Sequence, residues 1–303
     1  MVKLAKYLKP YVLLLFLAVF FIFVQAMSDL SLPDYMSKMV NVGIQQGGII
    51  NAVPEAIRKS EMDKLLLFVT PEEKGEILND YTLVDKSSVD YNKYIKKYPI
   101  LSKEPVYVLK NIDSSEIDKI NLSLGKAWLA VKGIEQAKAN AKNGSIEFDG
   151  KKIPANVDLF SMMSQLPEEQ LLKVRDEMNK KFASLGDNMV IQAATMAVKD
   201  EYKAIGIDTN KIQTDYILHT GLIMLLITGL SALSTIMVAF FASKVAAAVA
   251  RDLRRDLFAR VESFSNAEFD KFSTASLITR TTNDITQIQM LLVIMIRMVF
   301  YAL

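Results

Sequence analysis

The feature that most constrains this chain is a run of 27 residues, 216–242, that contains no ionised side chain. A helix rises ~1.5 Å per residue, so a helix of this length exceeds the ~30 Å hydrocarbon core of a bilayer. Within lipid, a single segment satisfies its backbone polar groups only as a helix. The run therefore predicts a transmembrane helix and excludes an ordinary soluble fold for the whole chain.

Two further apolar runs accompany the first, at residues 11–27 and 290–303. The run 11–27 contains no Gly or Pro and extends through Leu32 if Asp29 lies at the outer interface. Such a run is long enough for a second membrane span. The third run ends with the sequence itself at residue 303. Taken together, the runs predict a membrane protein with a polar insert between its first two spans.

The first ten residues allow two interpretations. Lys3, Lys6 and Lys9 alternate with apolar residues ahead of Pro10, so residues 1–10 can form an amphipathic helix on the membrane surface. The same lysines could begin a cleavable signal peptide, which would leave a secreted domain. We prefer the surface helix and a retained first span, because the apolar run is long for a signal peptide.

Basic residues near the spans predict the orientation of the chain. Seven follow the 216–242 run, namely Lys244, Arg251, Arg254, Arg255, Arg260, Lys271 and Arg280, and three lysines precede the first run. Cytoplasmic flanks carry such an excess of Lys and Arg. We therefore expect a cytoplasmic N-terminus and an extracytoplasmic insert at residues 49–212.

Composition excludes several classes of function. The 36 basic and 34 acidic residues leave a formal charge of only +2, which argues against a nucleic-acid binder. The absence of cysteine excludes disulfides and thiol nucleophiles. A single histidine, His219, makes a catalytic triad or a multi-histidine metal site improbable, and we interpret it as interfacial, not as a proton relay. No phosphate loop of the form G-x-x-x-x-G-K-[ST] occurs, so no catalytic, cofactor-binding or metal-binding residues are assigned.

The insert has the mixed patterning of an α+β domain dominated by helices. Expected helices cover 114–143, 167–184 and 187–205, another starts at Thr70-Pro71, and expected strands cover 78–85, 105–110 and a hairpin at 146–153. Acidic pairs at 168–169 and 176–177 lack the spacing of a calcium loop, so solvated helix faces are the better interpretation. The aromatic residues around Trp128 are expected in the core, with a ligand pocket as the alternative.

Beyond residue 242 the apolar pattern continues at helical spacing to Phe264. This pattern predicts that the second span extends ~30 Å into the cytoplasm. A short helix is then expected at 268–274, followed by a third helix from Ser276 that becomes apolar at Met290. Arg297 lies inside that apolar segment, where an ionised residue either faces a cavity or forms a structural pair.

Several motifs of this arm resemble the exporter family of ABC transporters with the type IV fold, in particular its multidrug-type members. The similar segments are RRDLF at 254–258, EFDKFST at 268–274, LITRTTNDI at 277–285, LPDYM at 32–36 and VNVGI at 40–44. The resemblance covers about residues 1–48 and 214–303, and two distant stretches agree in order. The large insert and Ala275, where many relatives have Gly, depart from the family pattern.

The resemblance implies a mainly α membrane protein, the N-terminal part of an exporter half-bundle within a longer polypeptide. Its expected parts are a surface helix at 1–10, a first transmembrane helix with an outer extension at 11–48, the inserted domain at 49–212, a second transmembrane helix with a cytoplasmic extension at 213–264, a coupling helix at 265–275 and a truncated third helix at 276–303. The coupling helix would comprise Glu268, Phe269, Asp270, Lys271, Phe272, Ser273 and Thr274. Its two phenylalanines would be apolar anchors on a nucleotide-binding domain.

The implied partners are that nucleotide-binding domain, a second transporter half of identical or different sequence, and the lipid bilayer. ATP and Mg²⁺ would bind to the nucleotide-binding domain, which this sequence lacks. The implied location is a bacterial plasma membrane, crossed several times. A two-span receptor with an outer sensing domain is the alternative function, because its topology agrees with residues 1–264 equally well.

Overall fold

The computed structural model describes residues 6–140, 145–148, 151–154, 158–265 and 274–301. The chain divides into two compact units. The long-helix unit comprises residues 1–37 and 220–303, and the α+β unit comprises residues 38–219. Each unit contains its own cluster of buried hydrophobic side chains.

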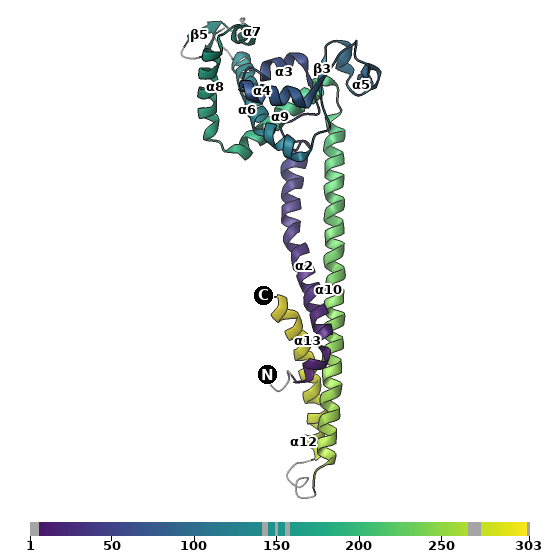
Figure 1. Ribbon diagram of the computed structural model, residues 1–303. Helices are drawn as coiled ribbons and strands as arrows, with labels where there is room; N and C mark the ends of the chain where they lie inside the picture. Colours follow the sequence, from purple (N-terminus) through teal and green to yellow (C-terminus); the bar gives the residue numbers. More distant parts are fainter. Residues whose placement is uncertain (1–5, 141–144, 149–150, 155–157, 266–273, 302–303) are drawn as a thin grey trace. The chain divides into compact units, whose positions relative to one another are not determined.

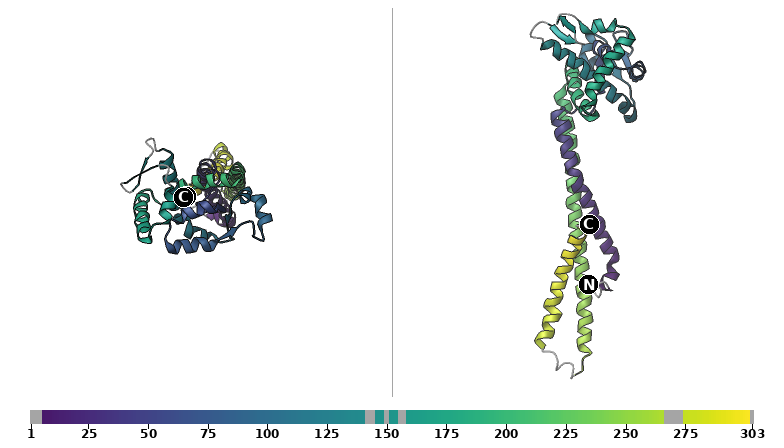
Figure 2. Two further views of the ribbon diagram at one scale, coloured as in Figure 1. Left: turned by 90° about the horizontal axis from the view of Figure 1, so that it is seen from above. Right: turned by 90° about the vertical axis from the view of Figure 1, so that its left-hand side faces the viewer.

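Three long helices dominate the long-helix unit in its described part, and Figures 1 and 2 show α2 and α13 running beside α10. The elements are the 3-10 turn η1 (Lys9–Tyr11), α2 (Val12–Lys38), α10 (Thr209–Glu262), α12 (Thr274–Thr279), the π-helical segment η4 (Arg280–Asp284) and α13 (Ile285–Tyr301). Among the described residues, two helices are long and apolar enough to cross a membrane, Lys6–Gln45 and Thr209–Glu262.

Both complete apolar runs of the sequence fold as helices, as predicted. The helix of the second run also continues without interruption to Glu262, close to the expected end at Phe264. Of the surface helix expected at 1–10, the structure describes residues 6–10, and these continue into the first span. Pro10 is the middle residue of the 3-10 turn η1, which lies between the two helical stretches.

Large apolar side chains remain exposed on the outside of α2 and α10. Leu13 is 71% exposed, and Leu225 and Leu226 are 68% and 63% exposed. Soluble proteins rarely leave contiguous apolar surfaces of this kind open to water. These exteriors are therefore suited to lipid.

Small side chains on α10 allow its neighbours to approach closely. Ala242, Val245, Ala246 and Val249 are fully buried, and they form one cluster with Ala18 of α2 and with Leu292 and Ile296 of α13. Close packing at small residues is the usual way in which membrane helices associate. Ala246 is the buried member of a run of three alanines at 246–248.

The α+β unit contains a three-stranded antiparallel sheet in the order β1-β3-β2. Its strands are β1 (Ala56–Arg58), β2 (Tyr81–Val84) and β3 (Val106–Leu109). Side chains alternate between the two faces of a strand, so Val106 and Val108 enter one hydrophobic cluster with Tyr98. Tyr107 and Leu109 pack against the larger cluster.

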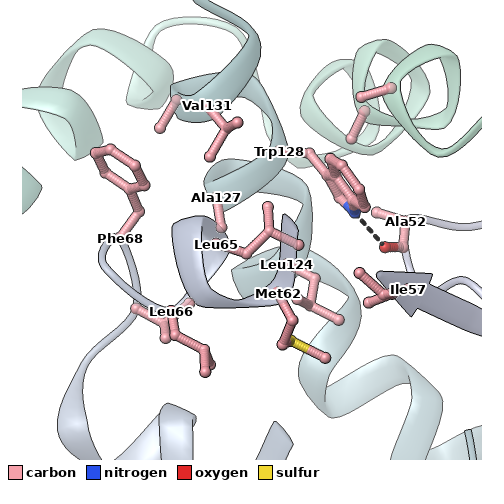
Figure 3. Close-up of a cluster of buried hydrophobic side chains, with 14 of the residues drawn as sticks. Ala52, Ile57, Met62, Leu65, Leu66, Phe68, Leu124, Ala127, Trp128 and Val131 are labelled. Atoms are coloured by element: carbon pink, nitrogen blue, oxygen red, sulfur yellow. Dashed lines mark hydrogen bonds between the residues drawn. The ribbon is translucent and has the colours of Figure 1, made fainter. Parts of the chain in front are cut away.

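The larger cluster lies between helices α3 (Lys59–Leu65), α6 (Ser114–Ala139) and α9 (Asp187–Ile205). Figure 3 shows Trp128 of α6 at its centre, fully buried, with the indole N–H donating to the backbone carbonyl of Ala52 at 3.1 Å. Asn121, also on α6, accepts from the backbone N–H of Ala52 at 2.8 Å. Trp128 and Tyr98 are buried in two separate hydrophobic clusters, which supports the core interpretation.

Helix boundaries in this unit follow their capping residues. Thr70 and Glu73 form a reciprocal capping box at the start of α4 (Pro71–Asp80). Helix α9 ends at Gly206, whose φ of +95° is left-handed, and the N–H of Ile207 bonds back to the carbonyl of Tyr202. This arrangement is a Schellman motif. The strand expected from residue 78 begins only at Tyr81, because the capped helix continues to Asp80.

The remaining elements also belong to the α+β unit. They are the π-helical segment η2 (Met39–Gln45), α5 (Tyr91–Lys97), the 3-10 helix η3 (Pro99–Ser102), β4 (Ser145–Phe148), β5 (Lys151–Pro154), α7 (Leu159–Ser164) and α8 (Glu168–Ala183). Strands β4 and β5 pair antiparallel, as the predicted hairpin requires. The Asp149-Gly150 turn of this hairpin lies outside the described residues. Helices α6, α8 and α9 lie where the sequence predicted helices, although α6 ends at Ala139 instead of residue 143.

Candidate functional site

A cavity of about 710 Å³ lies in the long-helix unit between α2, α10 and α13. Each helix contributes lining residues from one of the three apolar runs. If these runs cross the bilayer, the cavity therefore lies at membrane depth. Five of its eight lining residues are apolar, and the other three are Gln25, Thr235 and Arg297. The site therefore combines an apolar wall with a small number of polar groups, as ligand pockets usually do.

Arg297 contributes the positive charge of this cavity. It lies on α13, and its side chain is exposed. No carboxylate in the described part of the chain lies within ion-pair distance of it. Placing an ionised Arg at the centre of a transmembrane helix costs about 2.5–3.5 kcal/mol on insertion scales, so such residues usually serve a pathway or a partner.

The other two polar residues that line the cavity come from the two other helices. The Thr235 hydroxyl donates to the backbone carbonyl of Ser231 at 3.0 Å. The Gln25 amide makes no hydrogen bond within the described residues, so its donors and its acceptor remain available. Neither residue was singled out from the sequence, because an isolated Gln or Thr in an apolar run gives no signal until a neighbouring helix brings an Arg beside it.

One helical turn beyond these residues, α2 and α10 share a further polar contact. The Ser231 hydroxyl donates to the Asp29 carboxylate at 2.7 Å. Residues four apart lie on one helix face, so Gln25 and Asp29 follow each other on α2, as Thr235 and Ser231 do on α10. Asp29 at the outer interface was the condition for extending the first apolar run to Leu32, and in the structure its carboxylate meets the middle of the apolar run of α10.

A second polar cluster joins the start of α2 to the distal part of α10. The Tyr7 hydroxyl donates to Asp256 at 2.9 Å, and the Tyr11 hydroxyl donates to Asp252 at 2.6 Å. Arg251 donates to the Tyr11 oxygen at 3.0 Å. These contacts hold the two helices at a fixed register beyond the apolar run.

The sequence-predicted coupling segment can be located only in part. Glu268, Phe269, Asp270, Lys271, Phe272 and Ser273 lie outside the described residues, and Thr274 is the first residue of α12. The described residues are helical from Thr274 onward, and the expected third helix from Ser276 falls within this helical stretch. Helix α13 is also preceded by the π-helical segment η4, which the sequence did not indicate.

Several charged side chains in the described part of the α+β unit form ion pairs with one another. Arg58 of β1 donates to both carboxylate oxygens of Glu201 on α9, at 2.7 Å and 3.1 Å. This hydrogen bonding raises the pKa of Arg58 above its ordinary value. Burial raises the pKa of Tyr202, whose hydroxyl accepts from the backbone N–H of Glu55. Within the described residues, no three His, Asp or Glu side chains gather as a metal site would require.

Residues 190–303 match the protein family described as ABC transporter transmembrane region. The match therefore includes most of α9 and all of α10, α12 and α13. This part of the chain is similar to the membrane-spanning region of ABC transporters. The similarity supports a transport role and a location in a membrane.

Individual relatives are also described as ABC transporter proteins. The uncharacterised ABC transporter ATP-binding protein YfiB of Bacillus subtilis (strain 168) is 37% identical over 82 residues, which is 27% of this chain and 14% of the relative. Uncharacterised ABC transporter ATP-binding proteins of Mycobacterium bovis and Mycobacterium tuberculosis are 38% identical over 78 residues, which is 26% of this chain and 13% of each relative. The chain thus matches only a small part of the length of these relatives. No solved structure matches it significantly.

Proposed function

We propose that this chain is part of the transmembrane domain of an ATP-driven exporter of the multidrug type. One observation carries the proposal: the residues similar to transporter transmembrane regions include a single helix of 54 residues, α10. About 20 residues cross a bilayer, so this helix extends well beyond it. A rigid extension can transmit movement between a membrane cavity and a distant partner, whereas a flexible loop would absorb the movement.

In this proposal the N-terminus and the end of α10 face the cytoplasm of a bacterium, and residues 49–212 lie outside the plasma membrane. The support is the distribution of Lys and Arg, which gather before residue 10 and after residue 242. The insert contains 24 basic and 26 acidic residues between 47 and 215. Long translocated domains are little constrained by charge, so this balance is compatible with an outer location.

Residues 268–274 act in this proposal as the coupling helix. They lie between the end of α10 at Glu262 and the start of α12 at Thr274, so movement of their binding partner would reach both helices. Phe269 and Phe272 would insert into a groove on a nucleotide-binding domain, with Asp270 and Lys271 at the rim. That domain would bind ATP and Mg²⁺, and a second transporter half, identical or different, would complete the pathway.

The experiment measures ATP hydrolysis and the transport of two fluorescent probes, cationic ethidium and anionic dansyl-undecanoate, by the full-length protein in inverted membrane vesicles. We expect the double variant Phe269→Ala/Phe272→Ala to retain membrane insertion and to lose transport of the probe that the unaltered protein carries, with ATP hydrolysis no longer stimulated by that probe. Phe23→Ala is the matched control, because Phe23 is 60% exposed on the outside of α2. Unchanged transport in the double variant refutes the coupling role.

A two-span receptor differs from an exporter in the chain beyond residue 264. The chain of a receptor would continue in the cytoplasm. In this chain the apolar helix α13 (Ile285–Tyr301) follows in sequence the segment that we propose to be cytoplasmic. A reporter that is active on only one side of the membrane, fused after residue 303, tests the difference. A wholly cytoplasmic reporter without a third membrane insertion contradicts the exporter proposal.

A further inference from the structure

We infer that the cavity between α2, α10 and α13 binds an amphipathic anion, whose carboxylate or phosphate head pairs with Arg297 and whose apolar body lies against the surrounding helices. This inference rests on the proposed export function and deepens it, because it names the chemical class of the molecule carried.

The sign of the ligand charge follows from the polar groups of the cavity. A guanidinium presents five N–H donors and no acceptor, and its planar fork suits bidentate binding of carboxylate or phosphate. The Gln25 amide adds two further donors and has no partner within the described residues. No Asp or Glu is among the eight lining residues. An excess of donors around one positive charge favours an anion and disfavours a cation.

The remaining lining residues indicate that the ligand also has an apolar body. They are Ile22 of α2, Val238 of α10, and Val293, Ile294 and Met298 of α13. The cavity volume of about 710 Å³ falls within the range of about 300–1,000 Å³ typical of small-molecule sites. A small inorganic anion would leave most of this apolar wall without contact, so an amphipathic molecule suits the site better.

Asp29 is the internal group that could neutralise Arg297 instead. It follows Gln25 by one turn on α2, but its carboxylate accepts the hydroxyl of Ser231 at 2.7 Å. It forms no ion pair with Arg297 within 4.0 Å. The Arg297 charge therefore remains uncompensated among the described residues, and charge interactions strengthen in surroundings of low dielectric constant.

The test uses the full-length protein in nanodiscs of phosphatidylcholine, without nucleotide, and measures binding by the fluorescence of dansyl-undecanoate. The methyl ester of the same probe, which lacks the charge, is the chemical control. We expect Arg297→Gln to weaken binding of the acid about tenfold or more, as the loss of a charge-assisted hydrogen bond would, and to leave the ester unchanged. Arg297→Lys keeps the charge but lacks the planar fork, so it should weaken binding of the acid less than Arg297→Gln does. Arg260→Gln, a loss of the same charge outside this cavity, should have no effect.

A second variant tests the apolar body independently of the charge. Ile294→Trp places a larger side chain on the cavity wall and should weaken the acid and the ester alike. Adding phosphatidylglycerol to the nanodiscs identifies the source of the anion. Displacement of the probe would indicate a lipid head group, and lack of displacement would indicate a non-lipid amphiphile.

Three results would overturn the inference: equal affinity for the acid and the ester, unchanged binding after Arg297→Gln, or recovery of lost stability by the exchange Asp29→Arg/Arg297→Asp. The last result would make Arg297 a structural partner of Asp29. Selective binding of the acid without ATP-driven transport of any probe would refute the export proposal alone. Ethidium transport without selective binding of the acid would refute this inference alone.

Discussion

Arg58 offers the sharpest test of how the α+β unit is held together. Its side chain joins β1 to α9 through three hydrogen bonds with Glu201, and it also lies within 3.8 Å of Glu104 and 4.0 Å of Glu61. The two partners differ in access to water, because the Arg58 side chain is 27% exposed and the Glu201 side chain is 2% exposed. Removing Arg58 by Arg58→Met therefore leaves a buried carboxylate without its counter-charge.

Substitution of Arg58 and substitution of Glu201 should lower the free energy of unfolding by different amounts. Breaking a fully buried ion pair from one side costs about 3–5 kcal/mol. Arg58→Met should cost about 3 kcal/mol, the lower end of this range. Arg58 is partly exposed, and the backbone N–H at position 58 still donates to Glu201 at 2.8 Å after the substitution. Glu201→Gln keeps an acceptor and leaves an Arg that reaches water, so its cost should be nearer 1–1.5 kcal/mol.

The assay is urea unfolding of the 303-residue chain in detergent, followed by tryptophan emission. The chain contains one tryptophan, Trp128, which is fully buried in the core of the α+β unit. The signal therefore reports this unit alone. The midpoint and the slope of the transition give the change in unfolding free energy.

The pH dependence provides an internal check on the cause. Arg58 remains protonated throughout, since its pKa is raised. In Arg58→Met the penalty comes from the negative charge of a buried carboxylate, so it should be smaller in acid than near neutral pH. A cost of Glu201→Gln equal to or above that of Arg58→Met, or a penalty independent of pH, would refute the reasoning.

Three further predictions concern single contacts. Thr70→Ala removes the capping box of α4 and should cost about 1 kcal/mol in the same tryptophan assay; an unchanged midpoint would contradict it. Gly48→Ala should destabilise the unit by more than about 1 kcal/mol, since the φ of Gly48 is +82° and a Cβ would lie 2.8 Å from a backbone oxygen. Gly133→Ala, in the open middle of α6, should instead stabilise it by about 0.5–1 kcal/mol. Tyr11→Phe removes the bond to Asp252 and should raise hydrogen exchange in the distal part of α10, with unaltered exchange as the opposing result.

Local signals explain which parts of the fold were predictable. The apolar runs predicted the helices α2 and α10 because lipid leaves a single segment no other way to satisfy its backbone. Helix α9 was predicted with its observed limits because Asp187 follows a Gly and a left-handed Gly206 follows Ile205. These signals act within a few residues of one another, so no knowledge of distant partners is needed.

Elements without such signals escaped prediction. Strand β1 has only three residues, and it becomes a strand through its pairing with β3, about fifty residues later. The candidate site shows the same limit. Arg297 stood out as an ionised residue in an apolar segment, but its neighbours Gln25 and Thr235 belong to helices more than sixty residues away.

By itself, therefore, the sequence determined that two long helices form, where several helices of the insert begin and end, and that Arg297 is exceptional, because hydrophobic run length, capping and charge are local quantities. Only the tertiary structure decided that Asp29 meets Ser231 and that Gln25, Thr235 and Arg297 share one cavity. These contacts depend on the register and rotation at which α2, α10 and α13 pack. That register is set by the sum of many small contacts along the helices, at small residues such as Ala18 and Ala246. Each of these contacts joins two helices, so the sequence of one helix alone does not predict it.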